Sequence, residues 1–128
     1  MARKIRMKAR ERSQEAAFKG RAFGLPDLLE ERRLRGEAYF EFLRIPAMSA
    51  GVYALPAGGT DPQGPHTEDE VYHVVSGRAK LRIGERDHDA TPGALLFVAA
   101  NVEHRFHSIE EDLTVLVFFA PAEAARRA

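Results

Sequence analysis

Two short segments of the sequence carry the side chains best suited to chemistry. The first contains His66, Glu70 and Tyr72. The second contains His104, three residues after a tight turn expected at Asn101, a residue type that tolerates the left-handed backbone conformation. Alternate side chains of an extended strand face one way, so His66 and Glu70 are expected to share a face with the typical core residue Tyr72. Ionisable groups on a buried face are costly unless they are paired or bind a metal. Two histidines and a carboxylate that converge there would match the facial triad of divalent ions such as Fe(II), which leaves coordination positions open.

The alternative for these residues is that each one only satisfies local hydrogen bonds. Their joint spacing favours metal binding over that alternative. The other three histidines are not expected to be ligands: His73 and His107 are out of phase with Glu70 and His104, and His88 lies in a charged hairpin.

The residues that position the first segment form a loop. Residues 56–65 contain three prolines and three glycines, which excludes a helix or strand there. A rigid loop that leads polar residues into a strand is a common way to build a site on a scaffold.

Around this loop the chain is patterned as short strands. A helix is predicted from Leu25-Pro26 to Gly36, because proline suits the first turn and glycine the residue after the last. A second, weaker helix is expected from about Ser13 to Lys19, with Ser13 as its N-cap. From Glu37 onward, apolar runs alternate with Gly, Pro, Asn and Asp, which predicts an antiparallel sandwich or barrel. The expected strands lie near 37–44, 48–55, 70–76, 78–83, 86–90, 94–98, 104–109 and 113–119.

The loop and the first segment resemble the first motif of the cupin superfamily, G-x5-H-x-H-x3-E-x6-G. The chain has Gly58, Gly64, His66, Glu70 and Gly77 at these spacings, so glycine stands at the first histidine position. The run Asp-Pro-Gln-Gly-Pro-His-Thr-Glu-Asp-Glu over residues 61–70 is similar to that of short bacterial cupins.

The second segment resembles the second cupin motif, G-x5-P-x-G-x2-H-x3-N. Gly93 and His104 match it, whereas Ala99, Asn101 and Ser108 stand at its Pro, Gly and Asn positions. The resemblance covers about residues 38–120. It implies an all-β fold, a cupin-type antiparallel jelly-roll barrel, over residues 37–120. A basic N-terminal arm with a short helix (residues 1–36) would precede the barrel, and a C-terminal tail (residues 121–128) would follow it.

The resemblance further implies a divalent transition metal, Fe, Mn, Zn or Ni, held by His66, Glu70 and His104. The usual fourth ligand is replaced by Gly64, which has no side chain. We favour Gln63 as the substitute, because a neutral oxygen limits the negative charge at the site. The alternatives are Asp61, Glu68 and water.

Metal-dependent chemistry on a small organic molecule is the first functional hypothesis. A dioxygenase, an isomerase or a lyase would fit, with Tyr72 as the candidate proton donor, but the sequence leaves open whether the protein is an enzyme. The alternative is a non-enzymatic module that binds a small molecule or metal, and a third hypothesis is a metal that only clamps the fold. A homodimer is expected, because the stretch Glu37 to Arg44 is apolar on both faces.

The amino-acid composition and charge limit the kinds of site, location and partner that the protein can have. The chain has 128 residues, no cysteine, and 19 basic and 19 acidic side chains. Residues 1–50 carry 12 − 7 = +5 and residues 51–128 carry 7 − 12 = −5. The lack of cysteine excludes disulfides and thiolate sites and fits a cytoplasmic location. No apolar run approaches the length of a membrane helix, so no membrane partner is expected. The basic arm lacks interleaved aromatic residues, so it is expected to pack on an acidic surface of this chain or a partner, and not on nucleic acid.

Overall fold

The computed structural model of the protein describes residues 19–124. Within that range one helix, α3, spans Leu25–Arg35, as the sequence predicts. Gly36 ends it in the left-handed conformation (φ 72°), and its N–H reaches the carbonyl oxygens of Arg32 and Arg33. The basic stretch before residue 19 and the weaker helix expected near 13–19 lie almost wholly outside the described residues. The described helix is too short and too polar to cross a membrane.

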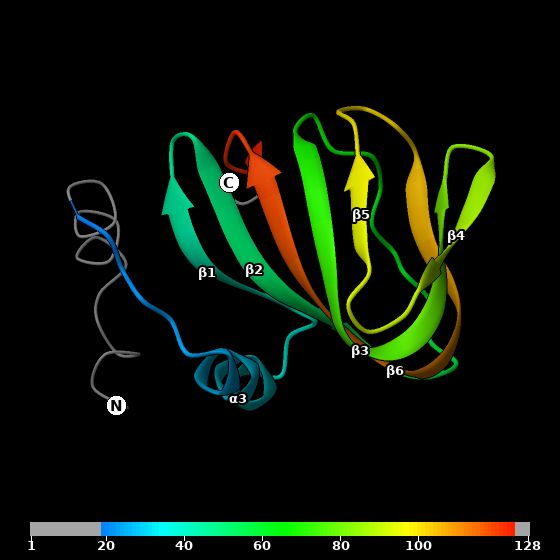
Figure 1. Ribbon diagram of the computed structural model, residues 1–128, viewed down its shortest axis with the longest axis horizontal. Coiled ribbons are helices and arrows are strands. Elements are labelled where there is room, and N and C mark those ends of the chain that lie inside the picture. The colour runs from blue at the N-terminus through cyan, green and yellow to red at the C-terminus, as the bar shows by residue number, and fades with distance from the viewer. Residues whose placement is uncertain (1–18, 125–128) are drawn as a thin grey trace.

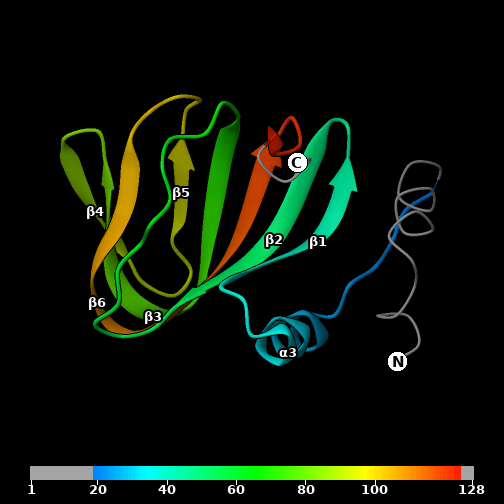
Figure 2. The same ribbon diagram turned by 180° about the vertical axis from the view of Figure 1, so that it is seen from behind.

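Six antiparallel strands, joined by loops and turns, make up most of the remaining described chain. They are β1 (Tyr39–Ile45), β2 (Met48–Leu55), β3 (Asp69–Ile83), β4 (Arg86–Ala90), β5 (Leu95–Val98) and β6 (His104–Ala120). The order across the sheet is β1-β2-β6-β3-β4, and β5 pairs with the first part of β3. The long strands β3 and β6 curve through the molecule and carry both halves of the folded sheet, with α3 beside β1 and β2 (Figures 1 and 2). This mostly antiparallel β fold is consistent with a jelly roll.

Two predicted strand breaks are absent. The sequence suggests separate strands at 70–76 and 78–83, but β3 continues through Gly77. Gly77 has φ 98°, and the register shifts on both sides of it, so the glycine forms a bulge that bends the strand without ending it. A Cβ at this position would collide with the carbonyl oxygen of Asp112 on β6. The expected break between 109 and 113 is likewise absorbed within β6.

The core lies between the two halves of the folded sheet. Buried and less buried residues alternate over long stretches of β3 and β6, as expected for strands with one face inward. The largest fully buried side chains include Tyr72, Leu81, Phe106 and Leu113. Glu70 shares this inward face and is itself 1% exposed. The fold therefore places a carboxylate in the core, as the strand periodicity predicts.

Candidate functional site

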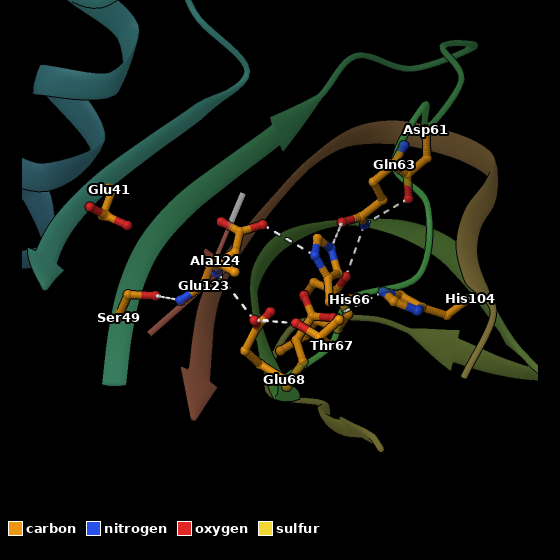
Figure 3. Close-up of polar contacts among 12 residues, drawn as sticks. Glu41, Ser49, Asp61, Gln63, His66, Thr67, Glu68, His104, Glu123 and Ala124 are labelled. Atoms are coloured by element: carbon orange, nitrogen blue, oxygen red, sulfur yellow. Dashed lines mark hydrogen bonds and ion pairs between the residues drawn. The ribbon is translucent and has the colours of Figure 1, made fainter. Parts of the chain in front are cut away.

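The structure brings together the three residues that the motif spacing singles out. His66 comes from the loop before β3, Glu70 from the start of β3, and His104 from the first position of β6. One potential ligand atom from each lies within 4.8 Å of the other two. Asn101, with φ 67°, donates its N–H to the carbonyl oxygen of His66 (2.6 Å), so the turn before β6 holds the loop against the strand. Figure 3 shows His66 and His104 near one another in this region.

The Glu70–His104 pair has the chemistry of a metal site. The His104 Nδ1 lies 2.9 Å from the carbonyl oxygen of Val102, which leaves Nε2 as the unprotonated nitrogen of a neutral ring. Nε2 is 2.9 Å from Glu70 Oε1, but the contact lacks hydrogen-bond geometry. Both Glu70 oxygens and His104 Nε2 are buried without a hydrogen bond to any described residue. Buried polar atoms are normally satisfied, so a cation bound by both side chains fits this arrangement.

Gln63 extends the same arrangement towards His66. Its amide nitrogen donates to Asp61 Oδ2 (3.0 Å) and to the Tyr72 hydroxyl (2.9 Å), which determines the orientation of the amide. The amide oxygen therefore faces His66 Nε2 at 3.0 Å. An oxygen and an imidazole nitrogen that face each other need a proton or a cation between them. The sequence could only nominate Gln63; the structure places its oxygen beside a candidate ligand.

The two acidic alternatives to Gln63 are engaged elsewhere. Asp61 accepts hydrogen bonds from the Tyr53 hydroxyl (2.6 Å) and the Phe106 N–H (3.0 Å), in addition to Gln63. Glu68 accepts hydrogen bonds through Oε2 from the Thr67 hydroxyl (2.5 Å) and the Ala124 N–H (3.1 Å). Both carboxylates therefore hold loops in place.

Tyr72 lies behind the site rather than in an opening. Its side chain is completely buried, its ring packs edge-on against Phe106, and its hydroxyl accepts the hydrogen bond from Gln63. Burial is the main cause that raises the pKa of Tyr72 well above its ordinary value, and the Glu70 carboxylate adds to the effect. The hydroxyl therefore stays protonated at neutral pH.

Sequence reasoning missed one residue of the site, Glu123. It lies after β6, in the segment predicted to be a tail, yet it is only 5% exposed. Its Oε2 is 3.2 Å from His66 Nδ1, on the opposite side of the ring from Gln63 (Figure 3). No motif or strand period marks Glu123, so the sequence held no signal for it.

The carboxylates also set the protonation of the two histidines. Glu123 is the main cause of a raised pKa of His66, against the opposing effect of burial. Burial has the largest single effect on His104 and lowers its pKa, but Glu70 and the Val102 carbonyl outweigh it, so the pKa is raised overall. Without a metal, both rings therefore hold a proton to higher pH than an ordinary histidine does.

A cavity of about 360 Å³ opens beside the site, and His66 and Gln63 contribute to its wall. Three carboxylates and three aromatic rings also line it: Glu37, Glu70, Glu123, Tyr39, Tyr53 and Phe119. Lysine and arginine are absent from the described residues that line this cavity. It therefore suits a neutral or cationic small molecule better than an anion.

The remaining histidines lie away from this centre, as the sequence predicts. His107 contacts Asp87 (2.9 Å) at the surface. His73 is on the outward face of β3, opposite Leu95 and Leu116. His88 is exposed on β4. None of the three belongs to the cluster around Glu70.

Comparisons with known proteins agree with the fold. The family model described as Cupin domain matches residues 51–119. An uncharacterized protein of Streptomyces coelicolor is 50% identical over 104 residues, which cover 81% of this chain and 99% of that protein. Among solved structures, TT1209 from Thermus thermophilus has a TM-score of 0.64 at 24% identity, covering 79% of this chain and 97% of that one. The Cnp3 cupin domain of Schizosaccharomyces pombe has a TM-score of 0.59 at 14% identity, covering 65% of this chain and 63% of that one.

Proposed function

This chain belongs to the cupin domain family, and from that premise we propose that it binds a divalent transition metal, Fe, Mn, Zn or Ni, in a jelly-roll interior. His66, Glu70 and His104 would be ligands, with the Gln63 amide oxygen as the fourth. The observation that carries the proposal is the buried Glu70–His104 pair, whose facing atoms have no hydrogen bond within the described chain. Imidazole, carboxylate and amide oxygen suit these ions.

We propose further that the metal serves an enzyme of the oxygenase, isomerase or lyase type. A bound ion would supply Lewis acidity towards a carbonyl or enolate oxygen. The residues of the chain would do the rest: the cavity orients a neutral or cationic organic molecule beside His66, and the aromatic walls exclude water. Tyr72 holds the Gln63 amide through its hydroxyl and is the candidate proton donor.

A metal assay tests the first proposal. The protein is purified without a nickel column, and its metal content and melting temperature are measured. We expect bound transition metal, and a rise in melting temperature on adding Mn(II), Fe(II), Zn(II) or Ni(II). Less than about one-tenth equivalent of metal together with no gain in stability would refute it. The His104→Ala variant should lose both effects.

One observation favours a binding module as the second candidate. The only predicted proton donor, Tyr72, is completely buried and is not among the described residues that line the cavity beside the site. A panel of diketones, phenols and polyols separates the two functions. Turnover by the metal-loaded protein supports the enzyme, and saturable binding without turnover supports the module.

We also propose a homodimer, formed through the outward face of the sheet. Leu95 and Phe97 of β5 are 71% and 60% exposed. Phe97 pairs with Val71, which in turn pairs with Phe118, so an apolar row crosses three strands on this face. The stretch that first suggested a dimer, β1, is partly covered within the chain: Phe42 packs against Phe23. Light scattering should show a dimer that Phe97→Lys dissociates; a wild-type monomer would refute this.

A further inference from the structure

The chain returns to the candidate metal site after its last strand. Glu123 follows β6 and is almost fully buried. Its carboxylate lies 3.2 Å from His66 Nδ1 and forms part of the wall of the 360 Å³ cavity. A residue near the C-terminus therefore contacts a ligand candidate that lies 57 positions earlier in the sequence (123 − 66).

Three anchors hold the backbone around Glu123. Its N–H donates to the Ser49 hydroxyl on β2 (2.9 Å), and its carbonyl oxygen accepts a hydrogen bond from Arg44 Nη2 on β1 (2.8 Å). The next N–H, that of Ala124, donates to Glu68 Oε2 (3.1 Å). Hydrogen bonds to β1, β2 and the loop before β3 thus determine where the carboxylate lies. Figure 3 shows those that involve Ser49 and Glu68.

The two sides of the His66 ring have different partners. Nδ1 faces the Glu123 carboxylate, and Nε2 faces the Gln63 amide oxygen at 3.0 Å. A neutral imidazole has one N–H and one lone pair, and a carboxylate can only accept. Glu123 therefore favours the tautomer with the proton on Nδ1. Nε2 is then the nitrogen left to bind a cation, together with Gln63.

We propose that Glu123 is a positioning residue of the metal site, which accepts the Nδ1 proton of His66 and so orients Nε2 towards the ion. This inference rests on the proposed metal binding. A carboxylate behind a ligating histidine fixes the ring orientation and makes the ring a better donor, and its loss typically weakens metal binding by about 10- to 100-fold. The segment at 121–124 thus becomes part of the binding site.

Zn(II) titration of the full chain against a competing chelator tests the proposal. Glu123→Gln removes the negative charge but keeps the size of the side chain, and should weaken Zn(II) binding by about 10- to 100-fold. Two controls remove a negative charge near the site and leave Glu123 in place. Glu37→Gln removes the charge of an exposed residue of the cavity wall, and Glu68→Gln removes a nearby buried charge while keeping an acceptor for Ala124. Both should bind Zn(II) within about threefold of wild type, less than the loss expected for a missing histidine partner.

Long-range ¹H–¹⁵N spectra of the zinc-loaded protein supply a second readout that a purely structural role would not move. We expect His66 to carry its proton on Nδ1 and the metal on Nε2 in the wild type. In Glu123→Gln we expect the Nδ1 resonance to shift towards that of a ring without a carboxylate partner.

Equal Zn(II) affinity of wild type and Glu123→Gln would overturn the inference while leaving the proposed metal site intact. Losses in the two control variants as large as that in Glu123→Gln would also overturn it, because the effect would then come from the loss of any nearby negative charge and not from the contact between Glu123 and His66. Zn(II) bound through Nδ1 of His66 would overturn it directly. Absence of Zn(II) binding by the wild type would overturn the metal site and this inference together.

Discussion

The substitution Glu70→Gln should separate the stability of the fold from its response to metal. Glu70 is 1% exposed, and neither of its oxygens has a hydrogen bond within the described residues. Glutamine has nearly the same shape but no charge, so it fills the same space beside His104 without a buried carboxylate charge. The substitution thus removes a buried charge that no hydrogen bond within the described residues offsets.

The expected magnitude follows from these contacts. A buried polar group without a hydrogen bond costs about 1–3 kcal/mol, and more when the group is charged. The variant also loses a favourable interaction, the attraction between the Glu70 carboxylate and protonated His104. This attraction is absent in the wild type as well once the pH exceeds the pKa of His104. At alkaline pH and without metal, we expect Glu70→Gln to be about 1–2 kcal/mol more stable than wild type. For a domain of this size, each kcal/mol corresponds to roughly 4–8 °C in melting temperature.

With metal present, the order of stability should reverse. At a metal concentration 100 times the dissociation constant, the wild type gains about 2.7 kcal/mol. If loss of the carboxylate weakens binding by about 100-fold, the variant gains only about 0.4 kcal/mol at the same concentration. Thermal unfolding at alkaline pH, with chelator and with Zn(II), measures both differences.

The exposed Glu103, close in sequence to His104, provides the matched control. Glu103→Gln should change neither the stability without metal nor the response to it by more than about 0.5 kcal/mol. Two results would refute the reasoning: Glu70→Gln destabilised by more than about 1 kcal/mol in chelator at alkaline pH, or a metal response equal to that of wild type.

Three further predictions follow from the same structure. The pKa values of His66 and His104 are raised in the folded protein, so protonation of these rings stabilises the metal-free fold. This contribution is fully present below about pH 6.5, and it is lost as the pH rises through the folded-state pKa values. Metal-free melting temperatures should therefore fall between pH 6 and 8 while the gain from Zn(II) grows; a gain that shrinks would contradict this. Gly77→Ala should lower the free energy of unfolding in urea by at least about 3 kcal/mol, because backbone strain at positive φ adds to the collision with the facing backbone. Gly84→Ala has the same kind of backbone strain but open space around it, so it should lower the free energy of unfolding by about 1–2 kcal/mol. If the Tyr72 hydroxyl is a proton donor, Tyr72→Phe should weaken metal binding less than tenfold and reduce turnover by a larger factor. Equal losses in metal binding and turnover would show that the hydroxyl only positions the Gln63 amide.

Much of the candidate site was predictable because three of its candidate ligands lie in two short segments with recognisable motif spacing. His66 and Glu70 lie four residues apart, and motif spacing marks both. Strand alternation explains the inward position of Glu70 only, because His66 lies in the loop before β3. The sequence also predicted the left-handed turn at Asn101 and the site position of His104. It predicted the strand interiors well, but it divided β3 at Gly77, because a glycine that ends a strand and one that forms a bulge look alike without the partner strand.

The details of the fourth position required the structure. Gln63, Asp61 and Glu68 are all close in sequence to the ligand candidates. The charge argument favours Gln63, but it does not show which of the three side chains are engaged elsewhere. Their hydrogen bonds do: Asp61 is held by Tyr53 and a backbone N–H, and Glu68 by Thr67 and Ala124, while the Gln63 oxygen faces His66.

The sequence by itself determined the β class of the fold and the three spaced residues of the site, because strand alternation and motif spacing act over a few positions. Only the tertiary structure decided that the His104–Glu70 contact lacks hydrogen-bond geometry and that Glu123 lies behind His66. The physical reason is the distance along the chain. A residue after the last strand reaches the site only when β6 has paired with β2 and β3, and the hydrogen bonds that then hold its backbone leave no mark in the local sequence.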